Sequence, residues 1–196
     1  MIVHKVVDQL YDGAQLHHAF CYENGGPLGA SIVYFRGPAE VKDHLVDIED
    51  RLADDFIKSK DMWHFIIEIP GATLTETVLW QRKFISICID KLREENVDPI
   101  RLRQEGDDII IYHDSDTLIN GTRRKMSVSI ATLSRFSGLI HAGINIEVGE
   151  GCPVPAIGLK DLIGGKFLSF AAHVSHDFVV EYDDILNATY KVSEVS

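Results

Sequence analysis

Three carboxylates lie within four positions of the chain, and an arginine comes shortly before them. The acidic residues are Glu105, Asp107 and Asp108, and the arginine is Arg103. Because Mg²⁺ and similar hard cations prefer carboxylate oxygens, Glu105 and Asp107 are candidate metal ligands. An exposed polar loop would account for the same acids. Arg103 and Asp108 are candidate ligand-binding residues, since a guanidinium holds anionic groups and a carboxylate accepts hydrogen bonds.

Other ionisable side chains stand in patterns that are open to two interpretations. Lys125 ends the basic run that starts at Arg123, so it is either a solvated residue at a hairpin end or a compact donor for phosphate and carboxylate groups. Glu68 shares a strand face with His64 among apolar neighbours, and a buried carboxyl group needs a partner or a raised pKa. Glu68 is therefore a candidate ligand-binding residue. His113 is another, although a solvated strand end is the commoner environment for such a residue.

Two further groups of polar residues have mainly structural interpretations. Asp47 and Asp50 are three residues apart in a helical pattern, so they share a face and can reach a pocket, or they stabilise the helix dipole. His141 lies in an apolar strand, where we expect a core histidine whose ring is hydrogen-bonded. His17 and His18 are adjacent, and adjacent strand residues point to opposite faces, so a metal ion shared between them is not expected.

Apolar periodicity predicts the elements that must position these residues. Helical spacing extends over residues 45–60 and 75–95. Runs of strand length lie at residues 30–36, 63–69, 100–103, 108–113, 125–133 and 139–148. Helices followed by a group of strands indicate an α+β fold with a mixed, mostly antiparallel sheet and helices on one face. We expect the strands between residues 100 and 148 to form one sheet, with a hairpin turn at Asn120-Gly121 and both helices behind it.

The composition indicates one globular domain spanning residues 1–196, with 45% hydrophobic and 25% charged residues. The formal net charge of −11 disfavours nucleic acid and anionic membranes as partners. No apolar run approaches the roughly 18 residues of a membrane span, and no signal-peptide core is present, so a cytoplasmic location is expected. The three cysteines are odd in number and form no CxxC pair, which predicts unpaired thiols.

The segment from Glu76 to Val148 resembles the catalytic core of biotin and lipoate protein ligases, which have a class II synthetase-like fold. It contains, in the same order, an arginine-bearing strand, an apolar strand ending at His113-Asp114, a lysine-bearing strand and a Gly-x-Asn strand. The resemblance implies that Lys125 is the catalytic lysine, which contacts the acyl carboxylate and the adenylate phosphate, and that Asn145 is a ligand-binding residue.

The whole chain is also similar to an uncharacterised prokaryotic family, domain of unknown function 366. The segments that carry this similarity are Val46-Asp-Ile-Glu-Asp50, Met62-Trp-His-Phe-Ile-Ile-Glu68, Gly106-Asp-Asp108 and Ser127-Val-Ser-Ile-Ala-Thr132. This family resemblance implies a fold relationship without an activity.

One loop departs from the ligase pattern. The ligases have Arg-Arg-x-x-Gly-Gly-Gly, whose glycines let backbone N–H groups approach a phosphate, whereas this chain has Arg103-Gln-Glu-Gly-Asp-Asp108. Carboxylates repel a phosphate unless a cation lies between them. Either no adenylate is made, or a metal holds it, or the ligand is not a phosphate.

The ligase resemblance implies a small-molecule-binding enzyme that forms an acyl-adenylate or transfers an acyl group, with ATP and magnesium as cofactors. One alternative is a metal-assisted hydrolase or phosphoryl-transfer enzyme that uses Glu105, Asp107 and Asp108. Another is a non-catalytic ligand-binding protein. The expected partner is a small molecule, and a homodimer is the alternative to a monomer. If the resemblance holds, Arg103, Asp108 and Lys125 line one pocket.

Overall fold

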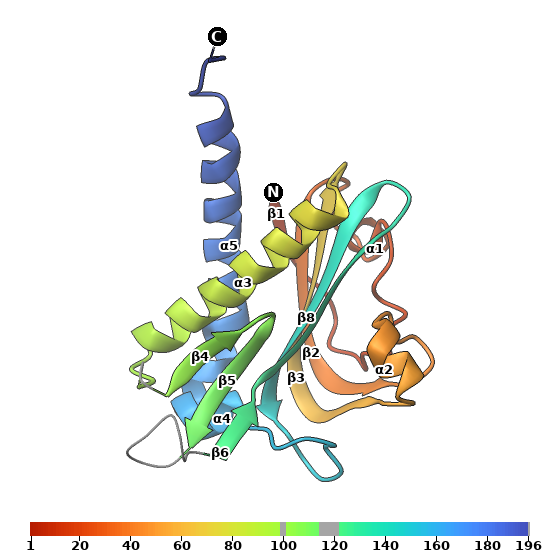
Figure 1. The fold of residues 1–196 in the computed structure, drawn as a ribbon, viewed down its shortest axis with the longest axis vertical. Coiled ribbons are helices and arrows are strands. Elements are labelled where there is room, and N and C mark those ends of the chain that lie inside the picture. Colours follow the sequence, from red (N-terminus) through yellow and green to blue (C-terminus); the bar gives the residue numbers. More distant parts are fainter. Residues whose placement is uncertain (99–100, 114–121, 196) are drawn as a thin grey trace.

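The computed structural model describes residues 1–98, 101–113 and 122–195, and places their strands in two sheets (Figure 1). The larger sheet has the order β1-β2-β3-β8-β7, and the smaller has the order β4-β5-β6. Apart from the parallel β1–β2 pair, the strand pairs described are antiparallel, as the sequence predicted. The strands are β1 (Ile2–Lys5), β2 (Ser31–Val41), β3 (Ile57–Pro70), β4 (Leu102–Glu105), β5 (Asp108–His113), β6 (Thr122–Lys125), β7 (Ser127–Leu133) and β8 (Ser137–Glu147).

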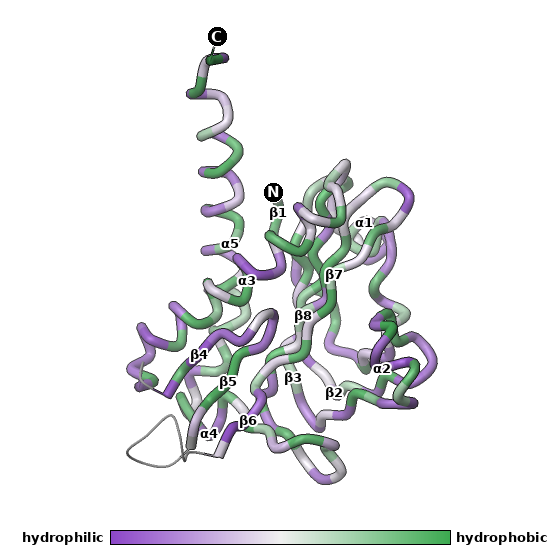
Figure 2. The backbone as a smooth tube through the Cα atoms, in the orientation of Figure 1, coloured by the Kyte–Doolittle hydropathy of each residue, from purple (hydrophilic) through white to green (hydrophobic). Residues whose placement is uncertain are grey.

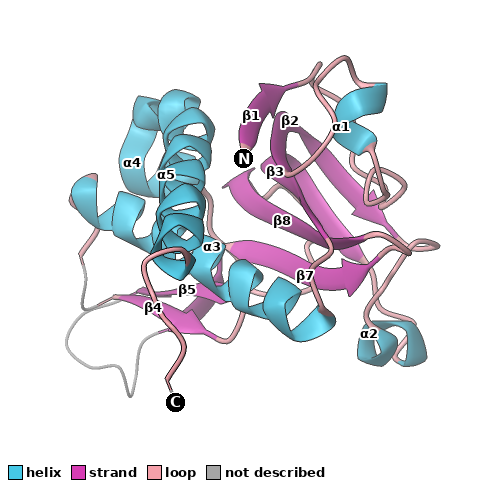
Figure 3. Cartoon of the chain, turned by 90° about the horizontal axis from the view of Figure 1, so that it is seen from above, coloured by secondary structure: helices cyan, strands magenta, loops and turns pink. Residues whose placement is uncertain are grey.

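The two long helices lie together on one face of the larger sheet (Figures 1 and 3). They are α3 (Leu74–Glu94) and α5 (Phe167–Thr189), and α5 follows the short helix α4 (Leu159–Ile163) and the 3-10 turn η1 (Gly164–Lys166). The short helices α1 (Phe20–Glu23) and α2 (Ile48–Leu52) lie on the other side of the sheet. A capping box between Thr73 and Glu76 starts α3, which confirms the predicted helix 75–95.

Strand β3 is buried on both of its faces. Trp63, Phe65 and Ile67 point into the main core with α3 and α5, whereas Ile66 packs into a second core with Phe35. Because side chains alternate along a strand, a strand covered on both sides reads as a continuous apolar run. The same alternation places His64 and Glu68 on the second face.

The prediction of a helix over residues 45–60 was wrong. Helix α2 covers only Ile48–Leu52, and β3 already begins at Ile57. The apolar residues that suggested one helical face do not share an environment, because Leu45 is buried in the second core while Leu52 is 83% exposed. Asp54 has a φ of 52°, in the left-handed region, and ends the helical turn.

The prediction of one sheet between residues 100 and 148 was also wrong. The strand expected at residues 125–133 divides at Met126, so that β6 pairs with β5 while β7 pairs with β8 in the larger sheet. The Met126 side chain is fully buried in the main core, and its N–H donates to the Ile109 carbonyl oxygen at 2.9 Å. The expected turn at Asn120-Gly121 lies outside the described residues.

The smaller sheet closes the main core beside α3. Leu102, Ile109 and Ile111 point into this core, while the opposite face carries the charged side chains. In Figure 2, β4 and β6 are mainly hydrophilic and flank the hydrophobic β5. The position of β5 between two partner strands explains why it was the most clearly predicted strand, with bounds of 108–113 in both sequence and structure.

Three other expectations can be compared with the structure. Cys21, Cys88 and Cys152 are free thiols, as predicted. The strand expected at residues 30–36 does not stop at Gly37-Pro38 but continues to Val41 through an irregularity between Gly37 and Ala39. Within the described part of the chain, no helix has the length and apolar character needed to span a membrane.

We predict that Gly37→Ala destabilises the protein, because a Cβ at this position would overlap the carbonyl oxygen of Gln9. Such overpacking costs about 1–3 kcal/mol of unfolding free energy. Gly165→Ala is the matched control, because a Cβ there meets nothing within 4 Å. Denaturant unfolding of both variants measures the difference, and equal stabilities would contradict the packing of Gln9 on β2.

Candidate functional site

A cleft of about 170 Å³ opens on the face of the larger sheet that faces away from α3 and α5. Its floor comes from β3, β7 and β8 and includes Met62, Val128, Ile130, His141 and Asn145. These residues share one face of the sheet, because Val128 pairs with Gly143 and Ile130 pairs with His141. The floor is therefore apolar in the middle, with polar groups at His141 and Asn145.

Three segments that are distant in sequence form the walls of the cleft. They are residues 44–50 at the start of α2, residues 55–59 at the bent start of β3, and residues 152–156 after β8. The last segment is held against β6, because Lys125 donates its N–H to Pro155 and accepts from the N–H of Ile157, at 2.9 and 3.1 Å. Backbone pairing thus brings Lys125 and residues 152–156 to the same edge of the cleft.

Lys125 lines the cleft and is ion-paired with Asp108, with 3.0 Å between Nζ and Oδ1. Asp108 lies two residues from Ile110, the partner of Lys125 across the β5–β6 pair, so both side chains share one face. Burial raises the pKa of the Asp108 carboxyl, and the neighbouring Lys125 partly opposes this shift. The expected proximity of Lys125 and Asp108 is confirmed. Asp108 itself does not line the cleft.

Arg103 does not lie in the cleft lining. Arg103 on β4 and Lys125 on β6 both pair with Ile110 on β5, so the two cations lie on either side of Ile110 in the smaller sheet. The Arg103 Nη1 donates to the carbonyl oxygen of Leu102 at 3.3 Å. The expectation that Arg103, Asp108 and Lys125 line one pocket therefore holds for Lys125 alone, since neither Asp108 nor Arg103 is in the lining.

The other two carboxylates of the acidic loop point to different partners. Glu105 accepts from the Tyr112 hydroxyl at 2.7 Å and from Arg123 Nε at 3.0 Å, and these bonds lower the pKa of its carboxyl. Asp107 accepts from Gln81, Arg82 and Ser129, at 3.0–3.1 Å.

The loop itself is a two-residue hairpin turn. Glu105 pairs with Asp108, and Gly106 between them has a φ of 64°, so its single glycine serves the turn. In the part of the chain that the structure describes, no group of three His, Cys, Asp or Glu residues could hold a metal ion. The structure thus gives the predicted metal ligands Glu105 and Asp107 other partners.

Asn145 lies in the cleft floor, and its ligand-binding role stays a prediction. Its side chain is 7% exposed, and its Oδ1 accepts from the Ser59 hydroxyl at 2.8 Å. Because the Oδ1 is engaged in this way, the Nδ2 amide group is left to donate into the cleft. The His113 side chain is outside the described part of the structure, so its ligand-binding role stays a prediction.

Glu68 lies far from this cleft, near the other end of β3. It is six residues from Met62, or about 20 Å along an extended strand. Its carboxylate accepts from the Ser137 hydroxyl at 2.8 Å and the Ala19 N–H at 3.0 Å, and it pairs with His18. These contacts tie the segment before α1 to the sheet, so Glu68 has a structural environment that satisfies its buried charge.

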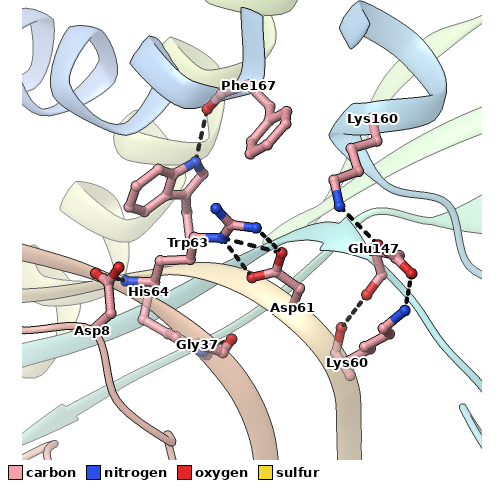
Figure 4. A network of polar contacts seen from close by, with 11 residues as sticks. Asp8, Gly37, Lys60, Asp61, Trp63, His64, Glu147, Lys160 and Phe167 are labelled. Carbon is pink, nitrogen blue, oxygen red and sulfur yellow. Dashed lines mark hydrogen bonds and ion pairs between the residues drawn. The ribbon is translucent and has the colours of Figure 1, made fainter. Parts of the chain in front are cut away.

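Two buried histidines adjoin the cleft floor. His64 and His141 are 0% and 2% exposed, and His64 Nδ1 lies 3.2 Å from His141 Nε2. The His64 Nε2 lies 3.2 Å from the carbonyl oxygen of Gly37, its neighbour on β2 in Figure 4. Tyr11 stacks on the His141 ring, with 3.7 Å between centroids and 11° between planes. Burial lowers the pKa of His64 to about 4 and that of His141 well below its ordinary value.

The cleft contains acidic residues that only partly stood out in the sequence. Asp47 caps α2 by accepting from the Glu49 N–H at 2.7 Å, and Asp47, Asp50 and Asp55 line the cleft. Burial, then repulsion from Asp47 and Asp55, raises the pKa of Asp50. The shared helical face of Asp47 and Asp50 did indicate a pocket. Tyr11 and residues 152–156 had no comparable pattern, because only long-range contacts bring them to the cleft.

The fold is that of the biotin and lipoate protein ligases. A mutant biotin protein ligase from Aquifex aeolicus, solved with biotin, superposes with a TM-score of 0.54 at 11% identity, covering 92% of this chain and 72% of that one. A bipartite lipoate protein ligase from Thermoplasma acidophilum gives a TM-score of 0.56 at 10% identity, covering 91% of this chain and 83% of that one. Identities this low show the shared fold alone.

The chain belongs to the family described as Domain of unknown function (DUF366), which it matches over residues 1–193. A protein of unknown function from Pyrococcus horikoshi has a TM-score of 0.84 and 32% identity, over 99% of this chain and all of that one. An uncharacterised protein of Methanocaldococcus jannaschii is 31% identical over 164 residues, which are 80% of this chain and 68% of that protein.

The buried histidines predict a pH dependence of stability. Between about pH 6.5 and pH 4, His64 takes up a proton in the unfolded chain but stays neutral in the folded protein, where its pKa is about 4. The unfolding free energy should therefore be greatest above about pH 6.5 and fall as the pH is lowered towards 4, by about 3 kcal/mol from His64. Urea unfolding between pH 7 and pH 4 measures this slope.

The slope has a matched control. His64→Phe should make it shallower, whereas changing the exposed His173 on α5 to Phe should leave this part of the slope in place. A wild-type slope that His64→Phe does not alter would contradict the assignment.

Proposed function

We propose that this protein binds a small organic molecule in the cleft between the larger sheet, α2 and residues 152–156. The observation that carries the proposal is the form of the cleft. It combines an apolar floor at Met62, Val128 and Ile130 with a few polar groups at its edges, His141, Asn145 and Lys125 among them. Such a combination is typical of small-molecule sites, in which apolar contacts contribute affinity and a few polar groups determine orientation.

The charges favour a ligand without a polyphosphate group. Among the lining side chains, three aspartates oppose Lys58 and Lys125, and Asp108 already neutralises Lys125. The nearby Arg82 and Arg123 are paired with Asp107 and Glu105. Lys125, Arg82 and Arg123 thus each have a carboxylate partner, and a phosphate binding to one of them would have to displace that carboxylate at a cost in Coulomb energy.

Acyl-adenylate formation or acyl transfer, with ATP and magnesium, is a second candidate. The specific observation in its favour is Lys125, which lies at the cleft edge with Asn145 in the floor, on a ligase-like fold. In this reaction Lys125 would donate to the acyl carboxylate and to the adenylate phosphate. A metal-assisted hydrolase using Glu105, Asp107 and Asp108 receives less support, because their side chains have separate partners.

The cleft can be tested by blocking it. Val128→Trp would fill the floor, whereas Val180→Trp changes a residue of α5 that is 56% exposed. We expect biotin or lipoate to bind the wild type and the Val180→Trp variant, and Val128→Trp to abolish the binding, as measured by isothermal calorimetry. Circular dichroism checks that both variants are folded. Binding of neither compound to the wild type, or binding that Val128→Trp leaves unchanged, would contradict the proposal.

The same calorimetry separates the two candidate reactions from simple binding. ATP with magnesium should bind if acyl-adenylate formation is the reaction, and magnesium alone should bind if metal-assisted hydrolysis is. Binding of biotin or lipoate without a nucleotide or a metal favours the ligand-binding protein.

Lys125→Ala should weaken the affinity for the bound compound by about ten- to a hundredfold, because a hydrogen bond to a charged group contributes roughly 1.5–3 kcal/mol. Stability should change by about 1 kcal/mol or less, since the Lys125–Asp108 pair is partly exposed, at 30% and 19%. The control is Lys160→Ala, which removes a partly exposed pair with Glu147. Equal affinities of the two variants would show that Lys125 does not contact the ligand.

A further inference from the structure

The histidine pair contains a hydrogen-bond acceptor that the protein itself does not use. His141 lines the cleft, is 2% exposed, and contacts His64 through its Nε2. Its other ring nitrogen, Nδ1, has no hydrogen-bond partner among the described residues. Because His141 lines the cleft, this nitrogen is available to form a hydrogen bond with a bound molecule.

The contacts of His64 determine which protons the two rings carry. The carbonyl oxygen of Gly37 can only accept, so His64 must donate to it from Nε2. A neutral imidazole has one N–H, which leaves His64 Nδ1 as an acceptor for the Nε2–H of His141. His141 has then used its only N–H, and its Nδ1 is a lone-pair acceptor. Both rings are neutral at pH 7, because burial depresses their pKa values.

The absence of a side chain at Gly143 lets Met62 and Val128 pack close to the His141 ring. A Cβ at Gly143 would lie 2.8 Å from Met62 Cε and 3.4 Å from Cε1 of His141, the ring atom bonded to Nδ1. Tyr11 covers one flat side of the ring at 3.7 Å and prevents it from tilting. The His141 ring that carries Nδ1 is therefore held in place.

The opposite end of the floor has hydrogen-bond donors, together with the carboxylate of Asp50, which interacts electrostatically with Lys125. Asn145 is four residues from His141 on the same face of β8, or about 13 Å along the strand. Its Nδ2 group and the Lys125 ammonium are potential donors there, and Lys125 is already paired with Asp108. His141 Nδ1 and these donors thus lie at different ends of the floor.

We propose that His141 Nδ1 determines specificity by accepting a hydrogen bond from an N–H or O–H group on the apolar body of the bound molecule. The inference rests on the proposed function, since it assigns the ligand's orientation in the same cleft. At this end the site excludes carboxylates, whose oxygens would face the nitrogen lone pair. The Nδ1 of neutral His141 can become a donor only if the proton leaves Nε2, and His64 would then have to donate from Nδ1 and lose its hydrogen bond to Gly37.

The tautomers can be measured without any ligand. Long-range ¹⁵N–¹H NMR of ¹⁵N-histidine-labelled protein at pH 7 should show the proton on Nε2 in both His64 and His141. His64→Phe and His141→Phe assign the signals. A proton on Nδ1 of His141 would overturn the inference and leave the proposed cleft untouched.

Indole and benzofuran form a matched pair of probes, because they share size and shape and only indole has an N–H. Indole should bind the wild type about five- to tenfold more tightly than benzofuran, the effect of roughly one hydrogen bond. Addition of indole should also shift the Nδ1 resonance of His141, which gives a result that needs no variant. His141→Phe should remove the preference for indole, and His173→Phe, on an exposed part of α5, should retain it.

The outcomes separate the inference from the proposed function. If both probes bind with equal affinity in competition with each other, or if His141→Phe keeps the preference for indole, His141 is not the determinant and the cleft remains a binding site. If neither probe binds and the Nδ1 resonance does not move, the cleft does not take apolar small molecules, and both proposals fail.

Discussion

The burial of β3 on both faces is the constraint on which the rest of the structure depends. Its backbone pairs with β2 on one side and β8 on the other, so its side chains alternate between two interiors. Trp63 and Phe65 help to form the main core with the long helices, while Met62 and His64 face the second interior. A polar residue on that second face must find partners inside the protein, which is why His64 is hydrogen-bonded on both ring nitrogens.

Charge pairing determines what the ligase-like position of Lys125 can do. The acidic loop that replaces a glycine-rich phosphate loop does not gather its carboxylates around one ion. Asp108 pairs with Lys125, and Glu105 pairs with Arg123. These pairs lower the free energy of bringing like charges close together, and they also neutralise the positive field that a phosphate would need. A shared fold therefore does not by itself fix the chemistry of a site, which depends on the residues present there.

The cleft and the main core lie on opposite faces of the same sheet, which separates the proposed binding site from most of the hydrophobic core. Its floor belongs to rigid strands, and its walls are short segments that enter from distant parts of the chain. The long helix α5 takes part only in the main core, and its C-terminal end extends beyond the sheets (Figure 1). Substitutions in the walls should consequently change ligand affinity more than the free energy of unfolding, whereas those in the floor affect both.

The sequence by itself determined the α+β class, α3 and β5, because these depend on local periodicity, and the ligase resemblance placed Lys125 near Asp108 without indicating their ion pair. It did not determine where α2 ends, the separation of β6 from β7 at Met126, or helix α5, since each depends on what covers the segment in the folded protein. The cleft, and with it the open nitrogen of His141, was decided by tertiary structure alone. Long-range pairing brings Tyr11 and residues 152–156 to one place, and no local pattern records that contact.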